Sequence, residues 1–145
     1  MVELTKQLNQ NLSDVQVLYV KLHNYHWNIK GQLFFGIHKQ TEEYYEYFAT
    51  VYDDIAERIL QIGGKPLVTV KSYLETAKIS EEGKTEFSAS EVLISLLDDF
   101  NYLLKEFKKT SQLASGKNDM GTQMMADEKT AWLEKAIWML NSSKG

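Results

Sequence analysis

All three histidines of this chain lie within sixteen residues, in the stretch HNYHWNIKGQLFFGIH, as His23, His26 and His38. Two carboxylates follow closely, at Glu42 and Glu43. Cysteine is absent, which excludes disulfides, thiolate metal sites and cysteine nucleophiles. Imidazole and carboxylate together make a mixed nitrogen and oxygen ligand set, which suits iron, manganese or zinc. The residue types therefore point first to metal binding.

Four candidate ligands share one face of a helix that we predict over residues 37–62. At 100° per residue, they lie at relative angles of about 0°, 40°, 60° and 100°. In that order they are His38, Glu42, Asp53 and Glu57. The first two are one turn apart, and so are the last two, so that each pair can share an ion.

A single helix cannot bring both pairs to the same ion. The distance along the helix from His38 to Asp53 is about 22 Å, whereas metal–ligand bonds measure about 2 Å. Either the pairs are separate half-sites, or a second copy of the helix supplies the missing half. An antiparallel copy related by a two-fold axis would create two identical sites per dimer. His26, on the packed side of the preceding helix and near the turn that leads to His38, fits the same site.

The ligand motif Glu-x-x-His, which holds a di-iron site in the centre of a helical bundle, is absent. The residues three positions before the histidines are Val20, His23 and Phe35. This absence favours a site between subunits over a site in the centre of one bundle.

Apolar residues recur at steps of three and four over residues 4–30, 37–62, 88–114 and after residue 119, which predicts four long helices. Glycines at 31, 63 and 64 are predicted to end the first two helices. The long connection 63–87 contains VTVKSYLETA, which we predict as a short helix. Ser88 and Glu91 have the spacing of a capping box. We expect no strand.

These elements predict an all-α fold. Short loops join the first helix to the second and the third to the fourth, so each of these pairs is antiparallel. The long connection lets the chain cross the bundle, which is the ferritin-like topology rather than the simple up-and-down one. The length of 145 residues suits one domain, which we expect to comprise residues 1–145.

The formal net charge is −4, so the chain as a whole does not attract phosphate backbones. The N-terminal residues resemble no signal sequence, and no apolar run approaches the length of a membrane span. We therefore expect a cytoplasmic protein with no membrane association. The two ends carry few lysines, and neither resembles a basic arm for binding DNA.

Each candidate ligand also has a structural interpretation. His26 can be a core histidine that donates to a backbone carbonyl, and His38 can cap a helix. Glu42 can belong to a solvated acidic face, and Asp53 and Glu57 can form surface ion pairs with Arg58, which stabilise little. Their common face and matched spacing make metal binding a hypothesis of equal weight. His23 has no matched acidic partner, so we interpret it as structural, and we interpret Met120, Met124 and Met125 as core-filling.

Several motifs of the sequence resemble the Dps family of mini-ferritins, the DNA-binding proteins from starved cells. They are HNYHWNIKG, then FFGIH with its histidine twelve residues after His26, then DDIAERI from Asp53 with Gly63-Gly64, and finally GGKP and the late KAIWML. The resemblance extends over nearly the whole chain.

The resemblance implies a hollow dodecamer of four-helix bundles that acts as a ferroxidase in oxidative stress. Such proteins oxidise Fe2+ to Fe3+, usually with hydrogen peroxide rather than dioxygen, and store the ferric mineral. Their mono-iron or di-iron centres lie at two-fold subunit interfaces. By position, His26, His38 and Glu42 would come from one subunit, and Asp53 and Glu57 from its neighbour.

The family often has aspartate at the position of Glu42, so the longer side chain here is expected to change iron occupancy of the weaker position. Trp27 lies beside the site and would be oxidised by stray radicals, which protects other groups. Iron would enter through three-fold pores, for which Asp119 and Asp127 are the candidates in this chain.

The chain departs from the family in lacking a lysine-rich tail, so we expect weak or no DNA binding at moderate salt. Two alternatives to a ferroxidase and iron store remain. One is a nucleoid-compacting DNA-binding protein with incidental metal, and the other is a purely structural helical bundle.

Overall fold

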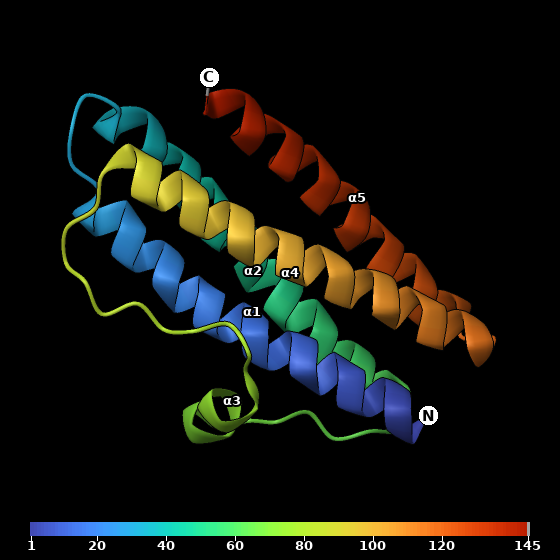
Figure 1. The fold of residues 1–145 in the computed structure, drawn as a ribbon. Helices are drawn as coiled ribbons and strands as arrows, with labels where there is room; N and C mark the ends of the chain where they lie inside the picture. Colours follow the sequence, from blue (N-terminus) through green and yellow to red (C-terminus); the bar gives the residue numbers. More distant parts are fainter. Residues whose placement is uncertain (145) are drawn as a thin grey trace.

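The computed structural model describes residues 1–144, which form five helices (Figure 1). Their bounds are α1 Val2–Asn28, α2 Phe34–Gln61, α3 Val70–Thr76, α4 Ala89–Gly116 and α5 Met120–Ser143. The four long helices and the short one lie where the apolar periodicity predicts them. Within this range there is no strand, only an isolated bridge between Ile29 and Phe87. None of the helices described is long and apolar enough to cross a membrane.

The long helices form two antiparallel pairs. Helix α1 packs most extensively against α2, and α4 packs most extensively against α5. Figure 1 shows the connection from α2 to α4 running along the bundle, with α3 beside α1. This arrangement confirms the predicted all-α bundle with a short helix in one long crossover between the second and third long helices.

The core consists of the predicted apolar stripes. The predicted stripe of α1 is half-buried at Tyr19 and buried at Leu8, Leu12, Val15, Leu18, Leu22 and Tyr25. In α2 the stripe from Tyr44 to Ile59 is buried. Aromatic rings join the two helix pairs, because Phe48 of α2 packs against Phe100 of α4 and Trp132 of α5, with ring centroids 5.6 and 5.4 Å away. Such edge-to-face contacts add to the stabilisation from burial. The rigid core therefore fixes the position of α2.

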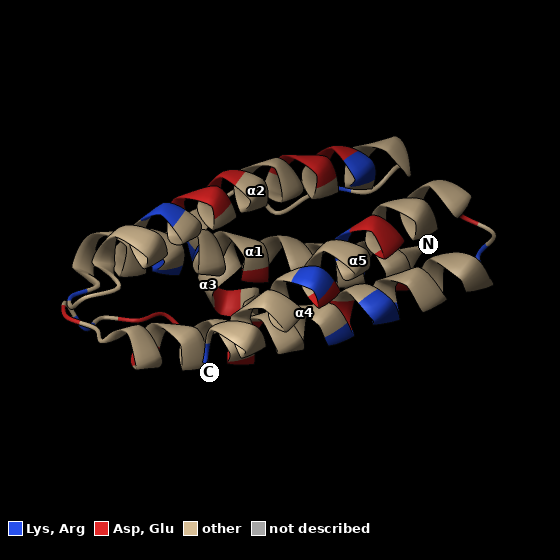
Figure 2. Ribbon diagram, turned by 90° about the horizontal axis from the view of Figure 1, so that it is seen from above, with Lys and Arg blue, Asp and Glu red and all other residues tan. Residues whose placement is uncertain are grey.

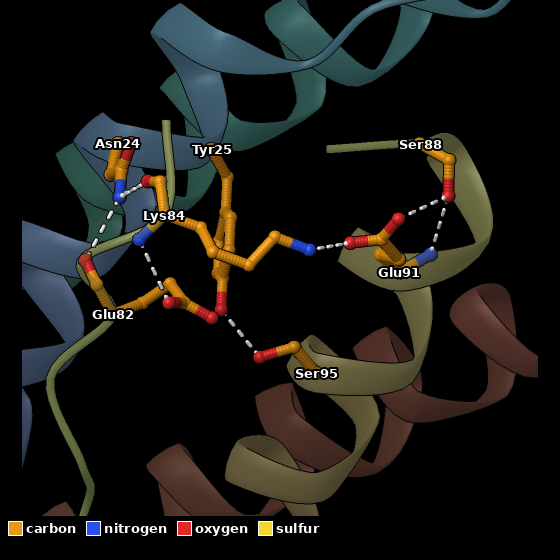
Figure 3. A network of polar contacts seen from close by, with 7 residues as sticks. All are labelled: Asn24, Tyr25, Glu82, Lys84, Ser88, Glu91 and Ser95. Atoms are coloured by element: carbon orange, nitrogen blue, oxygen red, sulfur yellow. Dashed lines mark hydrogen bonds and ion pairs between the residues drawn. The ribbon is translucent and has the colours of Figure 1, made fainter. Parts of the chain in front are cut away.

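The predicted capping box joins Ser88 and Glu91 at the start of α4. The Ser88 hydroxyl accepts from the Glu91 backbone N–H at 3.2 Å, as predicted. The Glu91 carboxylate also accepts from the Ser88 hydroxyl at 3.3 Å and from the Lys84 ammonium (Figure 3). The bond from the ammonium is charge-assisted, and such bonds are the stronger ones.

The same network holds the C-terminal end of α1 (Figure 3). The Asn24 amide donates to the carbonyls of Glu82 and Lys84, each at 2.9 Å. The Tyr25 hydroxyl and the Ser95 hydroxyl are 2.5 Å apart, and burial raises the pKa of Tyr25 to about 12. The turn that follows α1 contains Gly31 at φ 119°, a conformation that favours glycine. These contacts fix the end of α1 from which α2 departs.

Asp14 anchors the crossover, and the sequence analysis did not predict this role for Asp14. Its carboxylate is fully buried and accepts from the backbone N–H groups of Lys78 and Ile79, at 2.6 and 2.9 Å. It also accepts from the Tyr102 hydroxyl at 2.7 Å. Burial and this bond raise the pKa of Tyr102. A buried charge needs such partners, so this cluster joins α1, the crossover and α4.

Candidate metal centre

His26 and His38 lie against one another across the turn between α1 and α2. His26 lies in the last turn of α1 and is only 6% exposed, and His38 lies near the start of α2. The two imidazole rings stack with their centroids 3.7 Å apart and an angle of 13° between their planes. The short turn thus brings two nitrogen ligands together from different helices.

A reciprocal pair of hydrogen bonds holds the two rings. Nδ1 of His26 lies 2.6 Å from the backbone oxygen of His38, and Nδ1 of His38 lies 2.7 Å from the backbone oxygen of His26. A carbonyl oxygen can only accept, so each Nδ1 carries a proton and donates it. In the neutral imidazole, Nε2 then keeps its lone pair. Both histidines therefore have the tautomer and the second hydrogen bond that metal-binding histidines use.

The structure supports the structural interpretation of His26 and contradicts that of His38. His26 does donate to a backbone carbonyl, as a core histidine would, and the same bond leaves the Nε2 of the neutral imidazole unprotonated. His38 does not cap a helix, because α2 begins after Leu33, whose side chain makes no capping bond. The geometry of this pair is compatible with a ligand role, which remains a prediction.

The candidate carboxylates lie exposed along α2, which carries acidic residues over much of its length (Figure 2). Glu42 accepts a long hydrogen bond of 3.4 Å from the Tyr45 hydroxyl. Among residues 1–144, the side chains of Asp53 and Glu57 form no ion pair with Arg58, so that interpretation is wrong. The Arg58 guanidinium instead pairs with Asp119 at 2.7 Å and donates to Thr122 at 2.9 Å.

The described chain brings together one part of the predicted site, the pair His26 and His38, which we call the half-site. Within residues 1–144, no three of the His, Asp and Glu side chains come together in a way that could hold an ion. The structure joins His26 to His38 and leaves Asp53 and Glu57 further along α2. Their ligand roles, and that of Glu42, remain predictions.

His23 belongs to an aromatic cluster beside this half-site. Its Nδ1 donates to the Tyr19 backbone oxygen at 2.8 Å, and its ring stacks on Tyr45 with centroids 3.8 Å apart. The exposed ring of Trp27 lies 5.6 Å from the His23 ring. These contacts agree with the structural interpretation of His23. The protective role of Trp27 is still a prediction.

Two further residues touch the site, and sequence reasoning assigned them no part in it. Tyr45 lies on the ligand face of α2, and burial together with the Glu42 carboxylate raises its pKa. Thr41 is fully buried, with its hydroxyl 3.3 Å from Nδ1 of His26. For Thr41, the sequence did contain a signal: a polar residue occupies a position of the apolar stripe where a hydrophobic residue was expected.

The two pore candidates have partners within the chain. Asp119 caps α5 by accepting from the Thr122 N–H at 3.0 Å. Burial opposes its ionisation, but the bonds from Thr122 and Arg58 prevail and lower the pKa of Asp119. Asp127 accepts from the Ser111 hydroxyl at 2.5 Å. The cap and the ion pair give Asp119 a structural role, and pore roles for both residues remain predictions.

The interpretation of three methionines as core-filling is wrong for two of them. Met120 is 74% exposed and Met124 is 69% exposed, whereas Met125 packs partly against the core. Helix α5 turns one narrow face inward at its N-terminal end, and Ala126 and Thr122 fill that face. The periodicity of this end is weak, so the sequence did not show which methionines face inward.

Comparisons with known proteins agree with this fold. A model of the ferritin-like domain matches residues 5–143. The DNA protection during starvation protein of Helicobacter pylori is 44% identical over 140 residues, which make up 97% of this chain and 95% of that protein. The crystal structure of Helicobacter cinaedi CAIP has a TM-score of 0.96 at 46% identity and covers 98% of this chain and 99% of that one.

A Dps protein of Vibrio cholerae O1, described as a member of a broad superfamily of ferritin-like diiron-carboxylate proteins, has a TM-score of 0.95 at 33% identity. The match covers 99% of this chain and 89% of that one. These similarities confirm the ferritin-like fold class.

Proposed function

This chain belongs to the Dps family of ferritin-like proteins, and from that membership we propose that it oxidises ferrous iron with hydrogen peroxide and stores the ferric product inside a hollow dodecamer. The observation that carries the proposal is the stacked pair His26 and His38, whose Nδ1 atoms are both committed to backbone carbonyls. Two imidazoles with free Nε2 atoms, near the N-terminal end of a helix that carries many carboxylates, fit iron as the substrate.

The remaining ligands are proposed to come from two subunits. Glu42 follows His38 by one helical turn and would complete the first half of the site. Asp53 and Glu57 are exposed, and within residues 1–144 no ion pair occupies them. Both are therefore free to reach the histidines of a two-fold-related copy. The centre would hold one or two irons, and its carboxylates accommodate both Fe2+ and Fe3+.

The proposed reaction balances in electrons. Each ferrous ion gives up one electron, and hydrogen peroxide accepts two as its O–O bond breaks, which yields two hydroxide ions. The protein's part is to hold the ions close together and near the oxidant. Trp27, exposed beside the half-site, would reduce radicals that escape this two-electron route.

Iron oxidation by the purified apo protein tests the proposal. Anaerobic mixing with Fe2+ and hydrogen peroxide should consume about two ferrous ions per peroxide, because the site couples two one-electron oxidations to one two-electron reduction. The ferric product is followed by its absorbance and the remaining peroxide by titration. Oxidation no faster than in an iron-only blank would refute the proposed activity.

DNA binding is a second candidate function, and two observations favour it. First, the name of the Helicobacter pylori relative refers to DNA protection. That name speaks against our expectation that this chain binds DNA weakly. In addition, Lys6, Lys78, Lys105 and Lys109 surround two adjoining surface hollows between α1, the crossover and α4. Within residues 1–144, none of these four lysines forms an ion pair. We call them the lysine cluster.

We expect the lysine cluster to bind duplex DNA at low salt only. Each phosphate contact contributes a slope of about −0.9 to log K against log salt, so a few contacts weaken quickly as salt rises. In a gel-shift series, Lys105→Glu with Lys109→Glu should abolish the low-salt complex. Tight binding of the wild type at physiological salt would contradict the expectation of weak binding.

The control variant changes the net charge equally at a different place. Lys65 and Lys117 are exposed and lie outside the cluster, so Lys65→Glu with Lys117→Glu should keep the low-salt complex. Equal loss in both variants would show that binding follows net charge and not the cluster.

A further inference from the structure

Thr41 stands out on α2 because it is a polar residue in an apolar stripe. The other buried residues of this helix are Tyr44, Phe48, Val51, Ile55 and Ile59, and Thr41 is as fully buried as the most buried of them. A buried hydroxyl costs free energy unless it is hydrogen-bonded, and an apolar β-branched residue would fill the same space. The presence of a hydroxyl at this position therefore needs an explanation.

The partners of that hydroxyl supply the reason. Its oxygen lies 2.7 Å from the Ile37 carbonyl oxygen and 3.0 Å from the His38 carbonyl oxygen. It also lies 3.3 Å from Nδ1 of His26. A hydroxyl has one proton, and the carbonyls can only accept, so the proton of Thr41 is committed to them. Toward His26, the Thr41 oxygen can then only accept.

We propose that Thr41 is a positioning residue of the metal centre, whose buried hydroxyl accepts from Nδ1 of His26 and steadies the reciprocal bonds that leave Nε2 of both imidazoles free for metal. The inference rests on the proposed function of the site. It adds that the ligand geometry depends on a side chain that does not itself touch the ion.

The shared carbonyl shows how one hydroxyl can act on both histidines. The His38 backbone oxygen receives the Nδ1 proton of His26 and lies within reach of the Thr41 proton. Thr41 thus contacts the donor and the acceptor of the same bond. With valine in its place, Nδ1 of His26 would keep one acceptor, and the ring would lose its second restraint against rotation. Partners of this kind change metal affinity by about tenfold or more when removed.

Three variants of the assembled full-length protein test the inference. Thr41→Val keeps the shape and removes the hydroxyl, and Thr41→Ser keeps the hydroxyl. Thr50→Val is the control on the same helix, because the exposed Thr50 hydroxyl donates to the Tyr47 carbonyl at 2.6 Å and contacts neither His26 nor His38 of its own chain. Titration with Co2+, followed by its visible absorption, measures affinity and coordination. Nitrogen NMR of protein labelled only at histidine reports the tautomers of the apo protein, with just three side chains to assign.

We expect Co2+ affinity to fall about tenfold in Thr41→Val, with His26 losing its uniform Nδ1–H tautomer. His23, whose Nδ1 donates to Tyr19, serves as the internal reference and should not change. Thr41→Ser should restore both readouts, and Thr50→Val should leave both as in the wild type.

Wild-type tautomers and wild-type affinity in Thr41→Val would overturn the inference. So would a serine variant that behaves like the valine variant, since packing rather than the hydroxyl would then matter. If the wild type itself binds no Co2+ and oxidises no iron, the proposed function fails instead. The tautomers of the apo protein distinguish these cases, because they are measured without metal.

Discussion

Replacing His38 and Asp53 together by alanine should reduce iron oxidation to the rate of the protein-free blank. His38 contributes one of the two imidazoles fixed by the reciprocal bonds, and Asp53 is the exposed carboxylate proposed to complete the site of a neighbouring subunit. Losing one ligand from each half leaves too few donors to hold ferrous ions close together. Stopped-flow absorbance after mixing with Fe2+ and peroxide measures the rate, and size-exclusion chromatography with light scattering measures the assembly.

Assembly should survive in this variant, because His38 is only half-buried, Asp53 is exposed and neither belongs to the main core cluster. A matched control removes one histidine and one acid that lie outside the proposed ligand set, His23→Ala with Glu43→Ala. Glu43 is exposed on α2, so the control should retain most of the activity. A double variant of His38 and Asp53 that still oxidises iron at the wild-type rate would remove these residues from the site.

Mixing two inactive single variants should restore activity if the site lies between subunits. In a dimer of a His38→Ala chain with an Asp53→Ala chain, one of the two sites loses both ligands and the other keeps every ligand. Random pairing of equal amounts therefore leaves about a quarter of all sites intact by two-fold symmetry. Co-expression of the two chains, followed by the iron and peroxide assay, measures the recovered fraction.

The dependence on the mixing ratio makes this test quantitative. The intact fraction is the product of the two chain fractions, so activity should peak at equal amounts and fall toward either pure variant. Mixing two variants of the same half, His26→Ala with His38→Ala, provides the control, because no pairing of these chains gives an intact half. If the first mixture also recovers nothing, the histidines and Asp53 do not act across a two-fold interface.

Much of the fold was predictable because helical periodicity is a local property of the sequence. Steps of three and four gave the four long helices, and Gly31 and Gly63 marked ends where the backbone adopts positive φ. The long gap between the second and third helices indicated the crossover. Asp14 was not predicted as its anchor, because the partners of its carboxylate lie 64 and 65 residues away in the sequence.

Spacing in the sequence grouped the candidate ligands, whose roles remain predictions, but it did not reveal the contacts that hold them. The spacing of His38 and Glu42 placed both on one face of a helix, and the helical rise separated them from Asp53. No spacing rule showed that Asp119 forms an ion pair with Arg58 and caps α5. The position of Thr41 in the apolar stripe indicated that it is buried, but no spacing rule showed which groups its hydroxyl contacts.

The sequence by itself therefore determined which residues could bind a metal and that one helix could not close the site. Only the tertiary structure decided how His26 and His38 are held, because their bonds cross from α1 to α2 through backbone oxygens. Backbone carbonyls are identical in every residue, so no sequence pattern identifies the ones that accept these protons. The turn at Gly31 and the packing of α1 against α2 bring them within reach, and that geometry sets the tautomer on which the proposed iron chemistry depends.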